Sequence, residues 1–158
     1  MNWPAWLLAG FVGTLVLTSL ESGAQELRLT RMSTPFLLGT MLTPVRDRAQ
    51  LVGFFTHLFN GQIFALVYVA VFHATGAVSA ARGALIGLCH AAAVLLLVVP
   101  LLPFIHPRMA SLRQGPTDLR RLEPPGPLGL YYGFSTPLAV MVSHAIFGAV
   151  VGALYHFR

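Results

Sequence analysis

The stretch LVGFFTHLFNGQIFALVYVAVF, residues 51–72, contains no charged side chain. About 20 consecutive apolar residues carry an α-helix across the hydrocarbon core of a bilayer. The stretch therefore predicts a transmembrane helix, because inside lipid a helix satisfies its own backbone hydrogen bonds. Outward from it, three more charge-free stretches lie at residues 1–20, 83–107 and 124–157. We predict four spans, at residues 3–20, 51–72, 83–105 and 137–157.

The composition indicates the same class of protein. The 158-residue chain is 56% hydrophobic and only 9% charged, where an ordinary soluble domain carries about 25% charged residues. So few charges cannot cover the surface of a soluble enzyme, and the single cysteine, Cys89, cannot form an internal disulfide. We predict an all-α polytopic membrane protein, with four transmembrane helices in a single domain over residues 1–158.

Arginines predict the orientation of these spans. They gather in the two long loops at Arg28, Arg31, Arg46 and Arg48 (residues 21–50), and at Arg108, Arg113, Arg120 and Arg121 (residues 106–136). Only Arg82 and Arg158 fall on the other face. Cytoplasmic loops are enriched in Lys and Arg, so we expect a bacterial inner-membrane protein with both loops cytoplasmic and both termini outside. This placement explains the basic charge without nucleic acid.

Three local features qualify the four-span pattern. Residues 1–24 end in Ser-Gly-Ala, small residues typical of a signal cleavage site, but no Lys or Arg precedes the apolar run. We favour a retained first span and leave cleavage open. Residues 35–44 are apolar yet too short to cross, which indicates an interfacial or re-entrant segment. Pro100 and Pro103 predict a bend near the cytoplasmic end of the third span.

Spans two and four share a pattern of [ST]-H-x3-G-x6-Y. It is Thr56-His57 with Gly61 and Tyr68 in the second span, and Ser143-His144 with Gly148 and Tyr155 in the fourth. Steps of four and eleven residues return to nearly the same helix face. A weaker echo links Ala5, Ala9 and Gly13 to Gly83, Gly87 and Ala91. We predict two repeated helical hairpins, related by an axis along the membrane normal.

Small residues recur at four-residue spacing in every span. Such series let helix backbones approach closely, because lipid offers no hydrophobic drive for helix association. The candidate packing glycines are Gly13, Gly61, Gly83, Gly87, Gly148 and Gly152.

The two His-x3-Gly-x6-Tyr helices, the Gly-Ala-Leu-Ile-Gly opening of the third span and His106-Pro107 at its end carry a resemblance. The chain resembles a family of small uncharacterised bacterial four-helix membrane proteins, grouped as a domain of unknown function. The resemblance implies the same four-helix fold and supplies no activity.

Ionisable residues inside membrane spans are functional candidates by default. His57 and His144 fall at equal depth in parallel spans, whereas His90 is counted from the opposite face and is expected to lie well away from them. Other polar residues that could line a path are Glu21, Asn60, Gln62 and His90. Asn60 and Gln62 are two positions apart and cannot share a helix face.

Several readings of the His57–His144 pair stay open. Two facing imidazoles could be axial ligands of a haem, with Gly61 and Gly148 leaving room for the porphyrin edge and Arg46 and Arg48 pairing with its propionates. They could equally make structural hydrogen bonds between helices. A metal site from Glu21, His57, His106 and His144 is conceivable but lacks a local ligand spacing, so no metal is predicted.

Three functions follow from these readings. We favour a non-catalytic accessory or scaffold subunit, associated with other membrane subunits or with copies of itself, because no acid–base pair or nucleophile stands out. The alternatives are a transporter or channel for protons or a small polar solute, and a haem-binding membrane protein.

Overall fold

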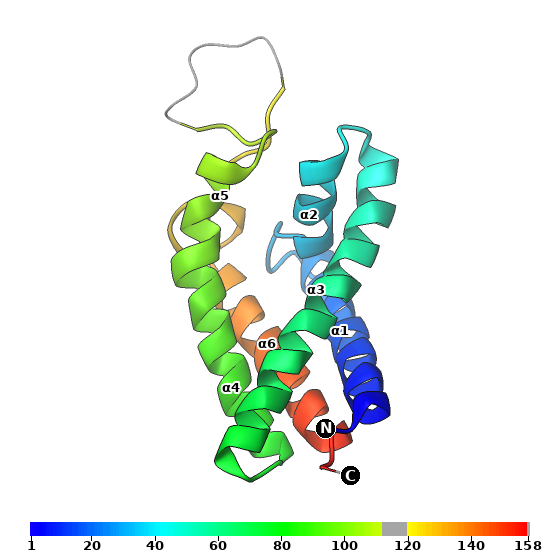
Figure 1. Cartoon of the computed structure of the whole chain (residues 1–158). Coiled ribbons are helices and arrows are strands. Elements are labelled where there is room, and N and C mark those ends of the chain that lie inside the picture. Colours follow the sequence, from blue (N-terminus) through cyan, green and yellow to red (C-terminus); the bar gives the residue numbers. More distant parts are fainter. Residues whose placement is uncertain (112–119, 158) are drawn as a thin grey trace.

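The structure, a computed structural model, describes residues 1–111 and 120–157. It is all-helical over these residues, with four helices long and apolar enough to cross a membrane (Figure 1). These spans are Trp3–Glu26, Arg46–Thr75, Ala80–Ile105 and Thr136–Leu154. The predicted all-α polytopic fold is therefore confirmed, whereas Arg113 and Arg158, two of the arginines used for orientation, lie outside the described residues.

Most helices extend beyond the apolar stretches that predicted them, because polar residues continue the turns. The elements in chain order are α1 (Trp3–Glu26), α2 (Thr34–Leu42), α3 (Arg46–Thr75), α4 (Ala80–Ala93), η1 (Val94–Val98), α5 (Val99–Ile105), η2 (Pro127–Tyr132) and α6 (Thr136–Leu154).

Local sequence signals explain where the helices begin and end. The side chains of Asn2, Ser33 and Ser79 accept hydrogen bonds from the first backbone N–H groups of α1, α2 and α4, the usual role of an N-cap residue. Helix α3 ends at Gly76, whose φ of 64° is left-handed and favours glycine. This turn leads directly into α4, so α3 and α4 lie close together at one end of the bundle (Figure 1).

Close backbone contacts join α4 to α6, and a contact between a glycine and an aromatic ring joins α1 to α6. A Cβ on Gly83 would meet the Gly148 carbonyl, and one on Gly87 would meet the His144 carbonyl. Gly13 of α1 packs against the Phe147 ring of α6. Such contacts need residues without side chains, as expected for helix packing in lipid.

Helix α1 joins α3 through Gly61, whose missing side chain makes room for Thr14. The helices therefore follow the order α3, α1, α6, α4 around the bundle. The two hairpins are packed in different registers. In the second hairpin, Gly148 contacts Gly83. The sequence patterns match Gly61 to Gly148 and Ala5 to Gly83, so an exact repeat would place Gly61 against Ala5, whereas Gly61 contacts Thr14. The internal repeat stays a prediction.

The short helix α2 packs against the beginning of α3. Gly39 lies against the backbone of Ala49, and Gly53 lies against the backbone of Pro35. Most of residues 35–44, expected to be interfacial or re-entrant, thus lie in α2, which ends at Leu42 and lies beside α3 at the end of the bundle where α5 also finishes (Figure 1).

A chain segment after residue 120 folds back onto this end of the bundle. The hydroxyl of Tyr132 donates to the Glu123 carbonyl at 2.5 Å, and the Arg31 backbone N–H donates to the Tyr132 carbonyl at 2.6 Å. Burial raises the pKa of Tyr132 to about 12, so its hydroxyl remains a donor at neutral pH. The Thr30 and Thr136 hydroxyls, 2.7 Å apart, join the loop after α1 to the start of α6.

The irregularity expected from Pro100 and Pro103 is a single π-helical turn, η1. The Val99 backbone N–H donates to the carbonyl of Val94, five residues earlier. Pro100 has no N–H to offer to Leu96, which removes a regular α-helical bond at this point. Turns of this kind are frequent at functional sites.

The close contact at Gly87 gives a test of the packing. We expect Gly87→Ala to destabilise the protein by about 1–3 kcal/mol, because the new methyl group would meet a backbone carbonyl. Thermal unfolding in detergent micelles measures the change. Gly23→Ala is the matched control, since no atom lies within 4 Å of its Cβ position. Equal stability of the two variants would contradict the packing described.

Candidate functional site

A cavity of about 190 Å³ lies between α3 and α4, whose backbones do not pack closely against each other. Its walls come from α1, α2, α3, α4, η1, α5 and α6, and most are aliphatic or aromatic. The polar side chains in the lining are Thr34, His57, Asn60, His90 and His144. An apolar hollow with a few convergent polar groups is typical of a small-molecule site.

The cavity reaches the protein surface between the two helices. Phe64 of α3 and Val98 of η1 both line it, and they are 40% and 45% exposed. Both lie within membrane spans. Exposed apolar side chains on a membrane span are suited to contact the hydrocarbon of a bilayer.

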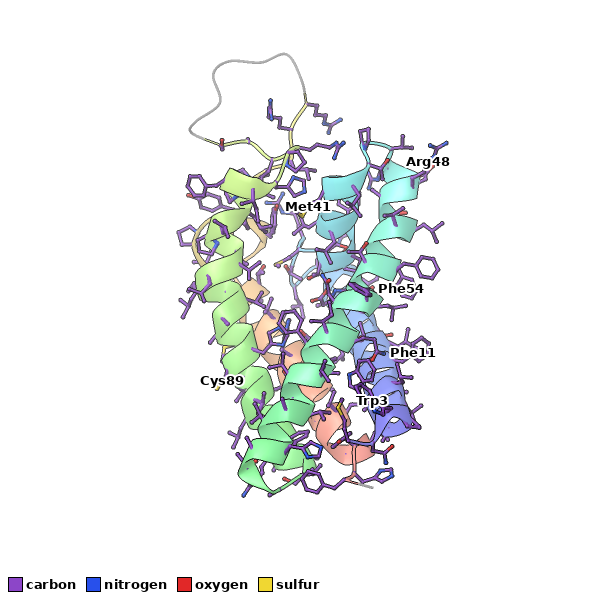
Figure 2. All side chains as sticks on the ribbon, in the orientation of Figure 1. Trp3, Phe11, Met41, Arg48, Phe54 and Cys89 are labelled. Carbon is purple, nitrogen blue, oxygen red and sulfur yellow. The ribbon has the colours of Figure 1, made fainter. Side chains whose placement is uncertain are left out.

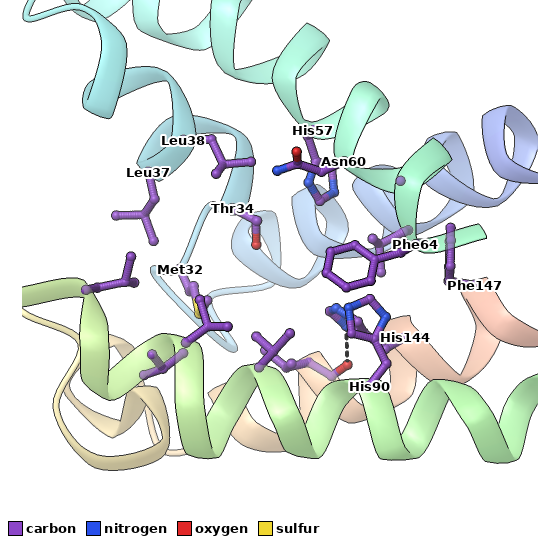
Figure 3. A pocket seen from close by; sticks show the side chains of 17 residues that line it. Met32, Thr34, Leu37, Leu38, His57, Asn60, Phe64, His90, His144 and Phe147 are labelled. Carbon is purple, nitrogen blue, oxygen red and sulfur yellow. Dashed lines mark hydrogen bonds between the residues drawn. The ribbon is translucent and has the colours of Figure 1, made fainter. Parts of the chain in front are cut away.

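His144 is held in a fixed orientation by its own helix. Its Nδ1 lies 2.9 Å from the Val140 carbonyl, and a carbonyl only accepts, so Nδ1 carries the proton (Figure 3). A neutral ring then has its free lone pair on Nε2.

His90 lies directly beside His144, with ring centroids 4.8 Å apart. The expectation that it lies far from the other histidines is wrong. Phe64 lies against the other side of His90, at 4.1 Å between centroids, and the Tyr68 hydroxyl is 3.2 Å from its Nδ1. The Nε2 of His90 is buried and has no hydrogen-bond partner among the described residues.

His90 lies close to His144 because the third span and α6 differ in length. The third span has 26 residues and α6 has 19, a difference of about 10 Å at 1.5 Å per residue. The start of α4 and the end of α6 lie together, where Gly152 meets the Ser79 carbonyl. Helix α6 therefore stops short of the end of α5, and His144 lies deeper in the bundle than a count from the cytoplasmic edge suggests.

His57 reaches the same cavity from α3, with Asn60 one turn further on. Figure 3 shows these two residues across the cavity from His90 and His144. Its depth matches that of His144, because Gly61 contacts α1 at Thr14 and Phe147 contacts α1 at Gly13. The Nε2 of His57 is buried and has no hydrogen-bond partner in the described part of the chain.

Two of the predicted lining residues lie elsewhere. Gln62 faces α1, where its amide donates to the Leu7 carbonyl at 3.1 Å; two helix positions separate it from Asn60 and turn it away from the cavity. Glu21 accepts a hydrogen bond of 3.0 Å from the Thr34 hydroxyl and lines a separate small void. Gln62 therefore adds nothing to the polar lining of the cavity, whereas Glu21 is connected to it through Thr34.

The space proposed for a porphyrin edge is occupied. Thr14 fills the position beside Gly61, and the Gly83 backbone with the Tyr68 ring fills that beside Gly148. The predicted propionate partner Arg46 instead lies over the Phe36 ring, 5.8 Å from its centre, outside the lining of this cavity. Both glycines pack against neighbouring helices, and Gly61 also lines the cavity.

His106 belongs to a different cluster from the cavity histidines. Its Nε2 lies 3.1 Å from the Leu37 carbonyl and 3.2 Å from the Thr40 hydroxyl, and its Nδ1 accepts from the Arg108 backbone N–H at 3.1 Å. It thereby ties the end of the third span to α2. Within the described residues, no three His, Cys, Asp or Glu side chains gather as a metal site.

Sequence reasoning missed the aromatic and aliphatic part of the site. Phe64 follows His57 by seven residues, two helical turns, and this spacing was a usable signal. Leu37 and Leu38 enter the cavity from α2, and Val98 enters from η1. No local pattern predicts those three, because they depend on how α2 and the π turn pack.

Comparisons of the chain with protein-family models, with curated proteins and with solved structures found no match. The resemblance to small four-helix membrane proteins therefore stays a proposal, and the functional argument rests on the site itself.

The His106 cluster predicts a local pH response. Burial lowers the pKa of His106 from the usual 6.5, so folding favours the neutral ring. The contribution of His106 to stability is therefore full above about pH 6.5 and falls as the pH drops below it. A protonated Nδ1 can no longer accept from the Arg108 N–H.

We expect the hydrogen-exchange protection factor of the Arg108 amide to stay constant from neutral pH to about pH 6.5 and to fall at lower pH, because the pKa of folded His106 lies below its usual 6.5. The Leu122 amide, which donates to the Arg108 carbonyl at 2.8 Å, is the internal control for general loosening of the segment. A constant Arg108 protection factor would show that His106 does not titrate as described.

Proposed function

We propose that the protein is a non-catalytic accessory subunit that holds an apolar ligand in the cavity between α3 and α4. One observation carries the proposal: the cavity is lined both by histidine side chains and by Phe64 and Val98, which are exposed apolar residues on helices long enough to cross a membrane. We infer that it opens toward lipid at these two residues. A ligand dissolved in the membrane can enter it without crossing water. The cavity offers binding and orientation, and the proposal assigns it no reaction.

The histidines indicate the chemistry of this ligand. The Nε2 atoms of His57 and His90 are buried without partners in the described residues, a cost that a hydrogen-bonding group on a ligand would remove. A Tyr68 hydroxyl that donates to Nδ1 leaves the proton of neutral His90 on Nε2. Phe64 offers an aromatic face beside them. A carbonyl-bearing ring with an alkyl tail, the class of the membrane quinones, fits these groups.

A decyl-substituted benzoquinone is a suitable probe, with binding measured by calorimetry on the protein in lipid nanodiscs. We expect Val98→Trp to weaken binding at least tenfold, because the indole would fill the opening. Leu97→Trp is the matched control, since Leu97 is 68% exposed and does not line the cavity. Binding that is unsaturable, or equal in both variants, would refute the proposal.

Haem is the second candidate for this cavity. His144 favours it, because a histidine whose Nδ1–H donates to a backbone carbonyl presents Nε2 as an oriented ligand. Against it stand the filled positions beside Gly61 and Gly148. A Soret band in the purified protein, lost in His144→Ala, would replace the quinone-class ligand with haem.

The accessory role and the orientation of the protein in the membrane are also proposals. We place the protein in a bacterial inner membrane with its termini outside, on the distribution of arginines. We expect gentle affinity purification from native membranes to yield other subunits in fixed stoichiometry. A homo-oligomer without other subunits would favour the transport alternative over the accessory role.

A further inference from the structure

A second pocket, of about 260 Å³, lies at the end of the bundle where α2, α3 and α5 meet. Four arginines line it: Arg46 at the start of α3, Arg108 after α5, and Arg120 and Arg121 before η2. We call it the arginine pocket. It is separate from the cavity between α3 and α4, and the inference below does not depend on the proposed function.

Hydrogen bonds hold the arginines of this pocket in place. The Arg108 guanidinium donates to the Thr40 carbonyl at 2.5 Å and to the Met41 carbonyl at 3.1 Å, which anchors it to the end of α2. Leu122 pairs with the chain around Arg108, through its N–H to the Arg108 carbonyl at 2.8 Å and its carbonyl to the Ala110 N–H at 2.9 Å. This pairing holds Arg121 beside the pocket.

No carboxylate lines the arginine pocket among the described residues. The Glu123 carboxylate, next along the chain, instead pairs with Arg31 at 3.0 Å. The Nε of Arg121 is buried and has no hydrogen-bond partner in the described chain. Gathered cations without an anion are unfavourable, and more so where water is partly excluded. The pocket thus has an excess of positive charge and a buried donor that a bound anion would satisfy.

We propose that the arginine pocket binds a phosphate group. Guanidinium groups match phosphate oxygens by paired hydrogen bonds, and basic pockets between transmembrane helices on the cytoplasmic side bind anionic headgroups. Phe36, Pro44 and Leu122 add apolar walls that suit the glycerol and first methylenes of a lipid. The same chemistry would accept free inorganic phosphate, so the two sources are separated by experiment.

The experiment titrates the detergent-purified protein with dihexanoyl phosphatidylglycerol, dihexanoyl phosphatidylcholine and inorganic phosphate in separate arms, with calorimetric readout. The test variants are Arg46→Gln and Arg121→Gln. Arg48→Gln is the matched control, because Arg48 lies on the same end of α3 and does not line the pocket; Figure 2 labels it at that end of the bundle. Thermal unfolding of each variant checks that the fold is retained.

We expect phosphatidylglycerol to bind at least tenfold more tightly than phosphatidylcholine, and this preference to disappear in both test variants but not in Arg48→Gln. If inorganic phosphate binds and phosphatidylglycerol does not, and both test variants lose phosphate binding, the site is assigned to the free anion. This result also supports a phosphate pocket. Absence of binding in both anionic arms, or equal binding in test and control variants, would overturn the proposal.

Discussion

Direct backbone contact between α4 and α6 is the constraint on which the rest of the structure depends. In lipid, apolar side chains gain nothing by leaving the solvent, so helices associate where their backbones can approach. Gly83, Gly87, Gly148 and Gly152 provide that approach, and Gly13 extends the contacts to α1. These contacts draw α1, α6 and α4 together and leave the backbones of α3 and α4 apart, so that these two helices meet mainly through side chains such as Tyr68 and His90. The cavity is a direct consequence of that one-sided packing.

Hydropathy predicts the existence of the four helices well, because crossing a bilayer requires a long apolar segment and little else. It predicts their ends poorly. Arg46, Asp47 and Arg48 continue α3 as a helix beyond the apolar stretch, since charged residues at a helix end can extend into the headgroup region. The depth predicted for His90 relative to His144 was wrong because α6 is short. Residues 127–135 fold back onto the bundle and do not continue the helix.

The candidate sites show the same division between local pattern and packing. The periodicity that placed His57 and His144 on equivalent faces identified two of the cavity residues. The cavity also needs α2, which packs on α3 through Gly39 and Gly53, and the π turn before Pro100. The arginine pocket gathers Arg46, Arg108 and Arg121 from three segments far apart in sequence. No spacing rule predicts such a gathering; it follows from the pairing of Leu122 with the chain around Arg108.

The unequal lengths of the spans also bear on how the protein sits in lipid. Only the apolar part of a helix has to match the hydrocarbon core of a bilayer. In α3 that part is residues 51–72, about 33 Å long, because charged residues begin the helix. Helix α6, with 19 residues, is about 28 Å long. A helix longer than the core accommodates the difference by tilting, at a cost of a fraction of a kcal/mol per Å. We therefore expect α3 to lie more oblique to the membrane normal than α6, so that one bilayer thickness fits both.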